Sequence, residues 1–159
     1  MSNDGGLIAS LEQWFADQLA ALQHESADVF KTADIWKHQI AATAGGMEAF
    51  GRYQPFAFVS YDSADAAREG DNDLRQVLAF AILIGVEARE AAVARIGDVD
   101  TLGVSKIRDL VIDLFDRKHP GEEFDCDEIY YTGDVEVFDA EKKYCIQMKF
   151  ETSKMTPVN

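Results

Sequence analysis

Apolar residues recur every three or four positions near the start of the chain. This spacing predicts an amphipathic helix from Leu7 to Leu22. The same spacing returns between Asp98 and Lys118, where Pro120 and Gly121 follow and end a second predicted helix. Asp98 or Asp100 is expected to cap the start of that helix, because a carboxylate there binds free amide N–H groups.

Several other segments alternate between apolar and polar residues and predict strands. Pro55 leads a strand that ends at Tyr61, and Leu74 to Ala88 forms a long strand. A hairpin is predicted near the end of the chain. Its strands are Ile129–Val137 and Tyr144–Phe150, its turn is 139–142, and it has one apolar and one polar face.

The remaining segments carry weaker patterns. Asp28 to Ala33 is a short candidate strand, and Ile35 to Phe50 resembles a helix or a helical loop. The polar stretch Asp62–Asp73 predicts a surface loop, because it is rich in aspartate and glycine. Thr152 to Asn159 is expected to form a flexible tail or arm.

The long strand at 74–88 is apolar on both faces. Leu78, Phe80, Ile82, Ile84 and Val86 share one face, and Val77, Ala79, Ala81 and Leu83 share the other. A helix is the alternative for so long an apolar run, but its β-branched content favours a strand. In a monomer, helices would cover both faces of the sheet; in an oligomer, a neighbouring subunit would cover the second. Since only about three helices are available, we favour the neighbour and take the second set as a candidate subunit interface.

The order of elements predicts a single α+β domain over residues 1–159. The strands cluster as hairpins instead of alternating with helices, which indicates a mostly antiparallel sheet of about four to five strands. The long N-terminal helix and the second helix are expected to pack on it. Apolar residues make up 47% of the chain and charged residues 28%, as in an average globular domain.

The net charge is more informative about possible partners than the overall composition. Asp and Glu total 29 against 15 Lys and Arg, which gives a formal charge of −14. Such a surface repels phosphate backbones and anionic lipids, so tight nucleic-acid binding and membrane association are disfavoured. A basic protein surface, or a nucleic acid that passes without adhering, remains a compatible partner. Solubility alone is the simplest reading of the charge.

No residue pattern predicts catalysis, a metal or a cofactor. The two cysteines, Cys126 and Cys145, lie in strand-like segments and are expected to be free thiols in a reducing cytoplasm, since the start of the chain lacks a basic signal peptide. The three histidines are scattered, and no glycine-rich phosphate loop or nucleophile motif occurs. The acidic runs at 71–73 and 122–128 do not have the spacing of a calcium loop.

The pattern as a whole resembles a known family. The residues that carry the resemblance are the N-terminal helix, the strand Pro-Phe-Ala-Phe-Val-Ser-Tyr at 55–61, the apolar strand at 77–86, the helix at 102–114, and the closing Cys-Ile-Gln-Met-Lys-Phe-Glu-Thr at 145–152. Together they resemble the Mu-like prophage tail proteins, which are related to the tail terminators of long-tailed phages and contractile phage-like particles. The resemblance covers about Leu7 to Thr152 and is least close in a variable segment, 24–54.

The resemblance implies a structural role in a virion tail assembled in the bacterial cytoplasm. Tail terminators form a ring, typically hexameric, that ends tube and sheath polymerisation and contacts the head connector or neck protein. The implied partners are therefore copies of the chain itself, tube and sheath proteins, and the connector. The loops 61–73 and 90–102, with the variable segment, are the expected partner contacts.

The acidity predicts where carboxylates should gather in such a ring, and it is also compatible with other classes of function. If DNA passes through the ring, its carboxylates should gather on one rim or in the bore. The candidates are Asp62, Asp65, Glu69, Asp71, Asp73, Glu122, Glu123, Asp125, Asp127 and Glu128. An acidic DNA mimic that occupies a basic site on another protein is the alternative function, and a small enzyme whose site forms between subunits is a third class.

Overall fold

The computed structural model describes residues 4–39, 50–70, 73–140 and 142–157. It is an α+β structure, as predicted, with a five-stranded sheet in the order β3-β4-β5-β7-β6. β3 (Thr32–Ile35) runs parallel to β4 (Phe56–Glu69); the pairs of β4 with β5 (Asp73–Glu87), β5 with β7 (Lys143–Pro157) and β7 with β6 (Tyr130–Ala140) are antiparallel. A two-stranded ribbon joins β1 (Gln23–His24) to β2 (Ala27–Asp28).

The predicted N-terminal helix and long strand are both confirmed. Helix α1 spans Asp4–Ala21 and β5 spans Asp73–Glu87, close to the bounds that their periodicities predict. β5 is the central strand, paired with β4 from Asp73 to Gly85 on one side and with β7 along its whole length on the other. The set Leu78, Phe80, Ile82, Ile84 and Val86 is fully buried, since α1 and α4 (Val104–Phe115) cover that face.

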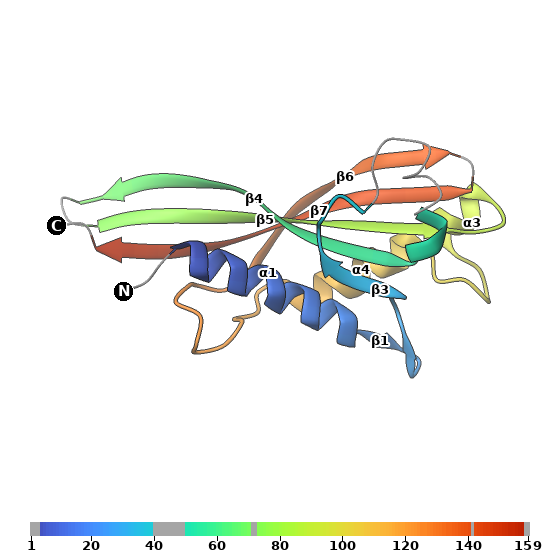
Figure 1. Ribbon diagram of the computed structural model, residues 1–159, viewed down its shortest axis with the longest axis horizontal. Coiled ribbons are helices and arrows are strands. Elements are labelled where there is room, and N and C mark those ends of the chain that lie inside the picture. Colours follow the sequence, from blue (N-terminus) through green and yellow to red (C-terminus); the bar gives the residue numbers. More distant parts are fainter. Residues whose placement is uncertain (1–3, 40–49, 71–72, 141, 158–159) are drawn as a thin grey trace.

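We call the face under α1 and α4 the first face of the sheet. Its core is aromatic: Phe15 of α1 lies 4.8 Å, ring centre to ring centre, from Phe115 of α4 and 5.3 Å from Phe80 of β5. Phe15 also contacts Phe150 in the middle of β7, so this cluster joins the first described helix to the last described strand. Figure 1 shows both helices on the same side of the strands.

The predicted loop at Asp62–Asp73 is wrong, and so is the predicted tail from Thr152. Asp62–Glu69 continues β4, and Thr152–Pro157 continues β7; both pair with β5. The strand patterns fail there because no helix covers this part of the sheet, so its side chains need not be apolar. We call these three strand ends, β4 62–69, β5 73–77 and β7 152–157, the arm; in Figure 1 they extend past the start of α1.

The second helix is shorter than its pattern predicts. α4 begins at Val104 and ends at Phe115, and a separate short helix, α3 (Ala91–Ile96), precedes it. Neither Asp98 nor Asp100 caps α4, whose N-cap is Gly103. The Asp98 carboxylate instead accepts hydrogen bonds from the amides of Asp100 and Thr101 at 2.9 and 2.8 Å and closes a turn between the two helices.

The weaker predictions for residues 28–50 hold only in part. Strand structure occupies 27–28 and 32–35, so Ile35 ends β3 and does not start a helix. Residues 36–39 are not helical, whereas residues 50–53 are helical. The intervening residues 40–49 lie outside the described residues.

The alternation predicted for the first hairpin strand also fails. β6 has register shifts between Tyr131 and Gly133 and between Glu136 and Phe138. The first shift moves the odd-numbered residues after Thr132 to the opposite face, so Val135 is exposed instead of buried. Gly133, with a φ of 134°, adopts a conformation that side-chain-bearing residues rarely adopt.

Candidate interaction surface

The second face of the sheet, opposite α1 and α4, holds the candidate interface residues Val77, Ala79, Ala81 and Leu83. Successive side chains of β5 alternate between faces, so these four follow one another along its centre. Ala81 is only 2% exposed, and the other three are half-buried. These four residues therefore form a partly exposed apolar row, on the face of the sheet that neither of the long helices α1 and α4 covers.

Aromatic side chains cover one end of this row. Phe56 and Phe58 of β4 stack at 4.9 Å between ring centres, and Phe50 packs on Phe56 at the same separation. Gly85 of β5 lies under Phe56, and a Cβ atom at Gly85 would overlap that ring. Cys145 of β7 is buried in the same cluster, where burial raises the pKa of its thiol to about 12.

A shallow groove of about 240 Å³ follows the aromatic cluster. Its lining residues are Trp36, Phe58, Ser60, Ala81, Leu83, Val137 and Gln147. Val135 and Val137 of β6 continue this apolar surface and are each 53% exposed. The alternation over Ile129–Val137 predicts both valines on its apolar, core-facing side; Gly133 within the strand is the signal of the bulge that exposes them.

The four candidate residues do not share one environment. Ala81 and Leu83 line the apolar groove, whereas Val77 and Ala79 lie beside polar partners in the register, Asp65 and Ser63 on β4 and Ser153 and Glu151 on β7. Between the two pairs, Lys149 of β7 reaches Asp62 of β4 at 3.8 Å. The apolar surface thus centres on Leu83 and Val137, and charge increases toward the arm.

The acidic candidates of β4 and β5 lie in the arm. Asp62, Asp65 and Asp73 are exposed strand residues. Glu69 belongs to the backbone of β4, but its side chain and the whole of Asp71 lie outside the described residues.

The other acidic candidates lie on the 116–129 loop between α4 and β6. Glu122, Glu123, Asp125, Asp127 and Glu128 are exposed. His119 fixes the loop: one ring nitrogen, Nδ1, accepts from the Gly121 amide at 3.0 Å, and Nε2 lies 2.8 Å from the Cys126 carbonyl. That leaves Cys126 in a loop, not in a strand as expected; it is half-buried, and burial raises the pKa of its thiol.

The fold brings the two acidic groups to the same end of the molecule. The Asp127 amide donates to the Ser153 carbonyl at 2.8 Å, and Ser153 pairs through Val77 with Asp65. Two strand spacings of about 4.8 Å separate β4 from β7, and a third separates β7 from Asp127, so Asp65 and Asp127 lie roughly 14 Å apart across the arm. They flank the arm on both edges and do not form one cluster.

A polar network that the sequence analysis missed ties α4 to β6. Arg108 Nε donates to Asp134 Oδ2 at 2.6 Å, and the Tyr131 hydroxyl donates to the same carboxylate. The hydrogen bond to Asp134 raises the pKa of Arg108, and burial together with Asp134 raises the pKa of Tyr131. All three groups satisfy one another, so the network is structural and offers no reactive atom.

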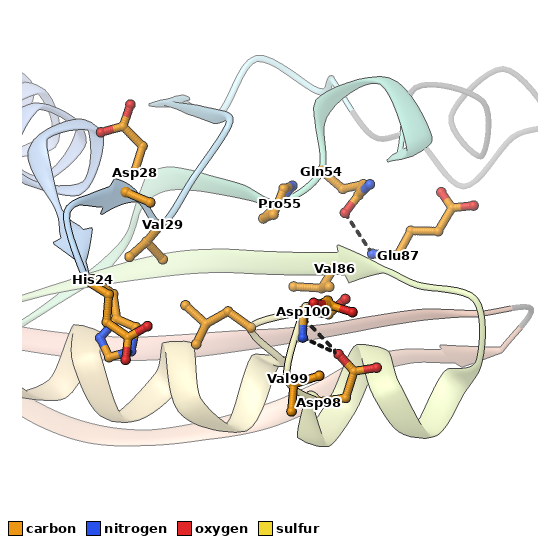
Figure 2. A pocket seen from close by; sticks show the side chains of 14 residues that line it. His24, Asp28, Val29, Gln54, Pro55, Val86, Glu87, Asp98, Val99 and Asp100 are labelled. Carbon is orange, nitrogen blue, oxygen red and sulfur yellow. Dashed lines mark hydrogen bonds and ion pairs between the residues drawn. The ribbon is translucent and has the colours of Figure 1, made fainter.

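A larger hollow of about 640 Å³ lies beside the end of β5 (Figure 2). The β1–β2 ribbon, Gln54 and Pro55, and the turn 98–102 line it. Its carboxylates are Glu25, Asp28, Glu87, Asp98 and Asp100, and two amides hold the pKa of Asp98 below its usual value. Lys143 pairs with Glu87 at 3.7 Å and Arg89 with Asp98 at 3.1 Å.

Neither the hollow nor any other described part of the chain forms a recognisable reactive centre. Among the described residues, no three His, Cys, Asp or Glu side chains are placed to hold a metal ion. The raised pKa of each thiol keeps it protonated near neutral pH, so neither cysteine is an activated nucleophile. In the part of the chain that is described, none of the helices has the length and apolarity to cross a bilayer.

Comparison with known proteins assigns no relationship. No family model matches the chain, and no curated protein sequence matches it.

Proposed function

We propose that the chain is a structural protein of a phage or phage-like tail, a tail terminator that caps the tail tube as a homo-oligomeric ring. The observation that carries the proposal is the second face of the sheet. Both long helices lie on the first face, and the apolar surface around Leu83 and Val137 stays partly exposed. Exposed apolar surface of this kind is typical of protein interaction sites.

The placement of the surface favours a ring over a symmetric pair. The apolar groove lies on one face of the sheet, and the charged arm lies at one end. These are different surfaces of the subunit, so a neighbour can cover the groove with a surface other than its own groove. Such a head-to-tail contact forms a ring when the rotation from each subunit to the next adds up to one full turn. A capping ring then ends tube and sheath growth and presents its other side to the connector.

One matched pair of variants tests the ring. Val137→Glu places a charge in the apolar surface, and Val99→Glu makes the same change at a loop valine that is 99% exposed. We expect light scattering and negative-stain images to show rings for the parent chain and for Val99→Glu, and smaller species for Val137→Glu. Circular dichroism checks that both variants fold.

A strict monomer at high concentration that also forms no ring on purified tube ends would exclude the proposal. A monomer that forms rings only on tube ends agrees with it, because the tube then supplies the template.

Within this proposal, the acidic loop at 122–128 is the part that lines a DNA bore. Asp62 is already paired with Lys149, which partly neutralises its charge. By contrast, no described ion pair joins Glu122, Glu123 or Asp125 to a cation. Free carboxylates repel phosphates, which would let DNA pass without adhering.

The bore is tested by the triple change of Glu122, Glu123 and Asp125 to lysine. Assembly should stay unchanged while DNA ejection slows, most strongly at low salt, where screening is weakest. Ejection that is unaltered at every salt concentration would show that this acidity serves solubility.

A further inference from the structure

The outer edge of β4, the edge away from β5, is closed along its first half only. β3 pairs with it from Phe56 to Val59, and the Trp36 amide then donates to the Val59 carbonyl at 2.7 Å. At Tyr61 the outward amide donates to Glu12 Oε2 of α1 at 2.9 Å. From Asp62 to Glu69, no described residue pairs with this edge.

The register identifies which backbone groups of the open half point outward. The Tyr61 amide points away from β5, so its partner Phe80 bonds toward β7. After the bulge at Asp62, the β4 residues that pair with even-numbered residues of β5 also point their backbone N–H and C=O groups away from β5, as Tyr61 does. Ala64, Ala66 and Arg68 pair with Leu78, Gln76 and Leu74, so their N–H and C=O groups face outward.

The side chains along this edge leave room for another strand. Ala64 and Ala66 lie on the first face, beyond the cover of α1, and Ser63 and Ala67 lie on the second face; all four are exposed. Small side chains leave space on both faces for the larger side chains of an added strand. An open strand of this length is a template for strand addition unless charges or bulges block it.

The charges around the arm select the partner. On the second face, Asp65 lies in the middle of the open edge and Asp73 lies next to its end. The cations nearby are Arg68, on the first face of the same edge, and Arg75 of β5, which donates to Ser153 of β7. The 122–128 carboxylates flank the arm on its other side. The opposite edge of the five-stranded sheet, on β6, carries the exposed Glu136 and Asp139 and two register shifts. Pairing β4 of one copy with β6 of another would bring acidic side chains together, which is destabilising.

We propose that the outer edge of β4 from Ala64 to Arg68 binds an extended segment of another protein, with lysine or arginine at alternate positions, as an added β-strand. The main-chain hydrogen bonds come from Ala64, Ala66 and Arg68. Selectivity comes from Asp65, which faces the side chains on the second face. The proposal does not depend on ring formation.

The probe is a blocked octapeptide of alternating valine and lysine, with a peptide of alternating proline and lysine as the control of equal charge. Proline removes the amide donors that an added strand needs, and general attraction to the acidic surface stays the same. Fluorescence anisotropy with the full chain should give about tenfold tighter binding for the valine peptide, the effect of one or two net hydrogen bonds.

Variants of Ala66 place the binding on this edge. Ala66→Pro removes an outward N–H and leaves the pairing with β5 intact, whereas Ala66→Thr keeps the N–H. The preference for the valine peptide should disappear in Ala66→Pro, persist in Ala66→Thr and weaken in Asp65→Lys. Circular dichroism checks folding, and Ala64→Pro provides a second variant of the same kind.

Equal binding of the two peptides to the parent chain would overturn the proposal, as would an undiminished preference in folded Ala66→Pro. If Ala66→Pro instead lowers the mass of the chain in solution, the edge binds a second copy and the basic-partner proposal is wrong. Because Val137→Glu tests the second face and Ala66→Pro tests the edge, failure of one leaves the other standing.

Discussion

The sheet has two halves that share three strands but differ in what surrounds them. In the half beneath α1 and α4, aromatic rings pack on the first face and a second aromatic cluster covers part of the other face. In the arm, the same three strands continue with mostly exposed aspartate, serine and alanine, although Thr152 and Lys154 of β7 are buried. Backbone pairing joins these strands, and Arg75 adds one side-chain hydrogen bond to Ser153 at 3.3 Å. Stability therefore resides in one half, and surface available to partners resides in the other.

The largest test of this difference compares one residue from each half. Phe15→Ala removes a fully buried ring that contacts Phe80, Phe115 and Phe150, and should lower the free energy of unfolding by about 3–5 kcal/mol. Leu74→Ala, in the half-buried part of the arm, should cost less than about 1.5 kcal/mol. Urea unfolding followed by circular dichroism measures both; equal losses would refute the division into halves.

A second test uses the buried thiol of Cys145. Its folded-state pKa is raised to about 12 from a usual value of 9.0, so the folded chain retains a proton that the unfolded chain releases. Stability from this group is complete below pH 9 and is lost as the pH rises toward 12, by on the order of 1 kcal/mol per pH unit. Cys145→Val should flatten that alkaline decline in urea unfolding curves.

The matched control is Cys126→Val, since Cys126 is only half-buried in its loop. An alkaline decline that is the same in the parent and Cys145→Val would show that the thiol is not sealed by the second cluster.

The smallest effect is expected where the two halves meet on the second face. Lys149 and Asp62 form a partly exposed ion pair at 3.8 Å. Lys149→Ala should change the free energy of unfolding by less than about 1 kcal/mol, with even less effect at high salt. A loss several times larger in urea unfolding would mean that this pair, and not backbone pairing, attaches the arm to the rest of the sheet.

The sequence predicted the elements whose burial repeats at a regular period. α1 and β5 are such elements, because their apolar residues face the core along most of their length. The arm was missed because exposed strands need no apolar alternation: Ala64, Asp65 and Ala66 read as loop, yet pair with β5. From the sequence alone, Asp98 is equally compatible with a helix N-cap and with a turn. Only the structure distinguishes these two positions.

The candidate surface was predictable to a similar degree. The apolar row of β5 was found because one strand contains it, and the structure divides it between an apolar groove and a charged margin. Val135 and Val137 were assigned to the wrong face because a bulge moves later residues across the sheet. Trp36 and Phe58 join the groove through tertiary contacts that no local pattern contains.

The contact between Phe15 and Phe150 has a consequence for biosynthesis. At ribosomal speeds of ~5–20 residues per second, α1 is complete about ten seconds before the strand that carries Phe150 is made. During that interval the apolar side of the nascent helix lacks its final partner. The chain therefore closes this core only after β7 has been synthesised, and until then the apolar side of the helix is exposed surface of the kind that chaperones protect.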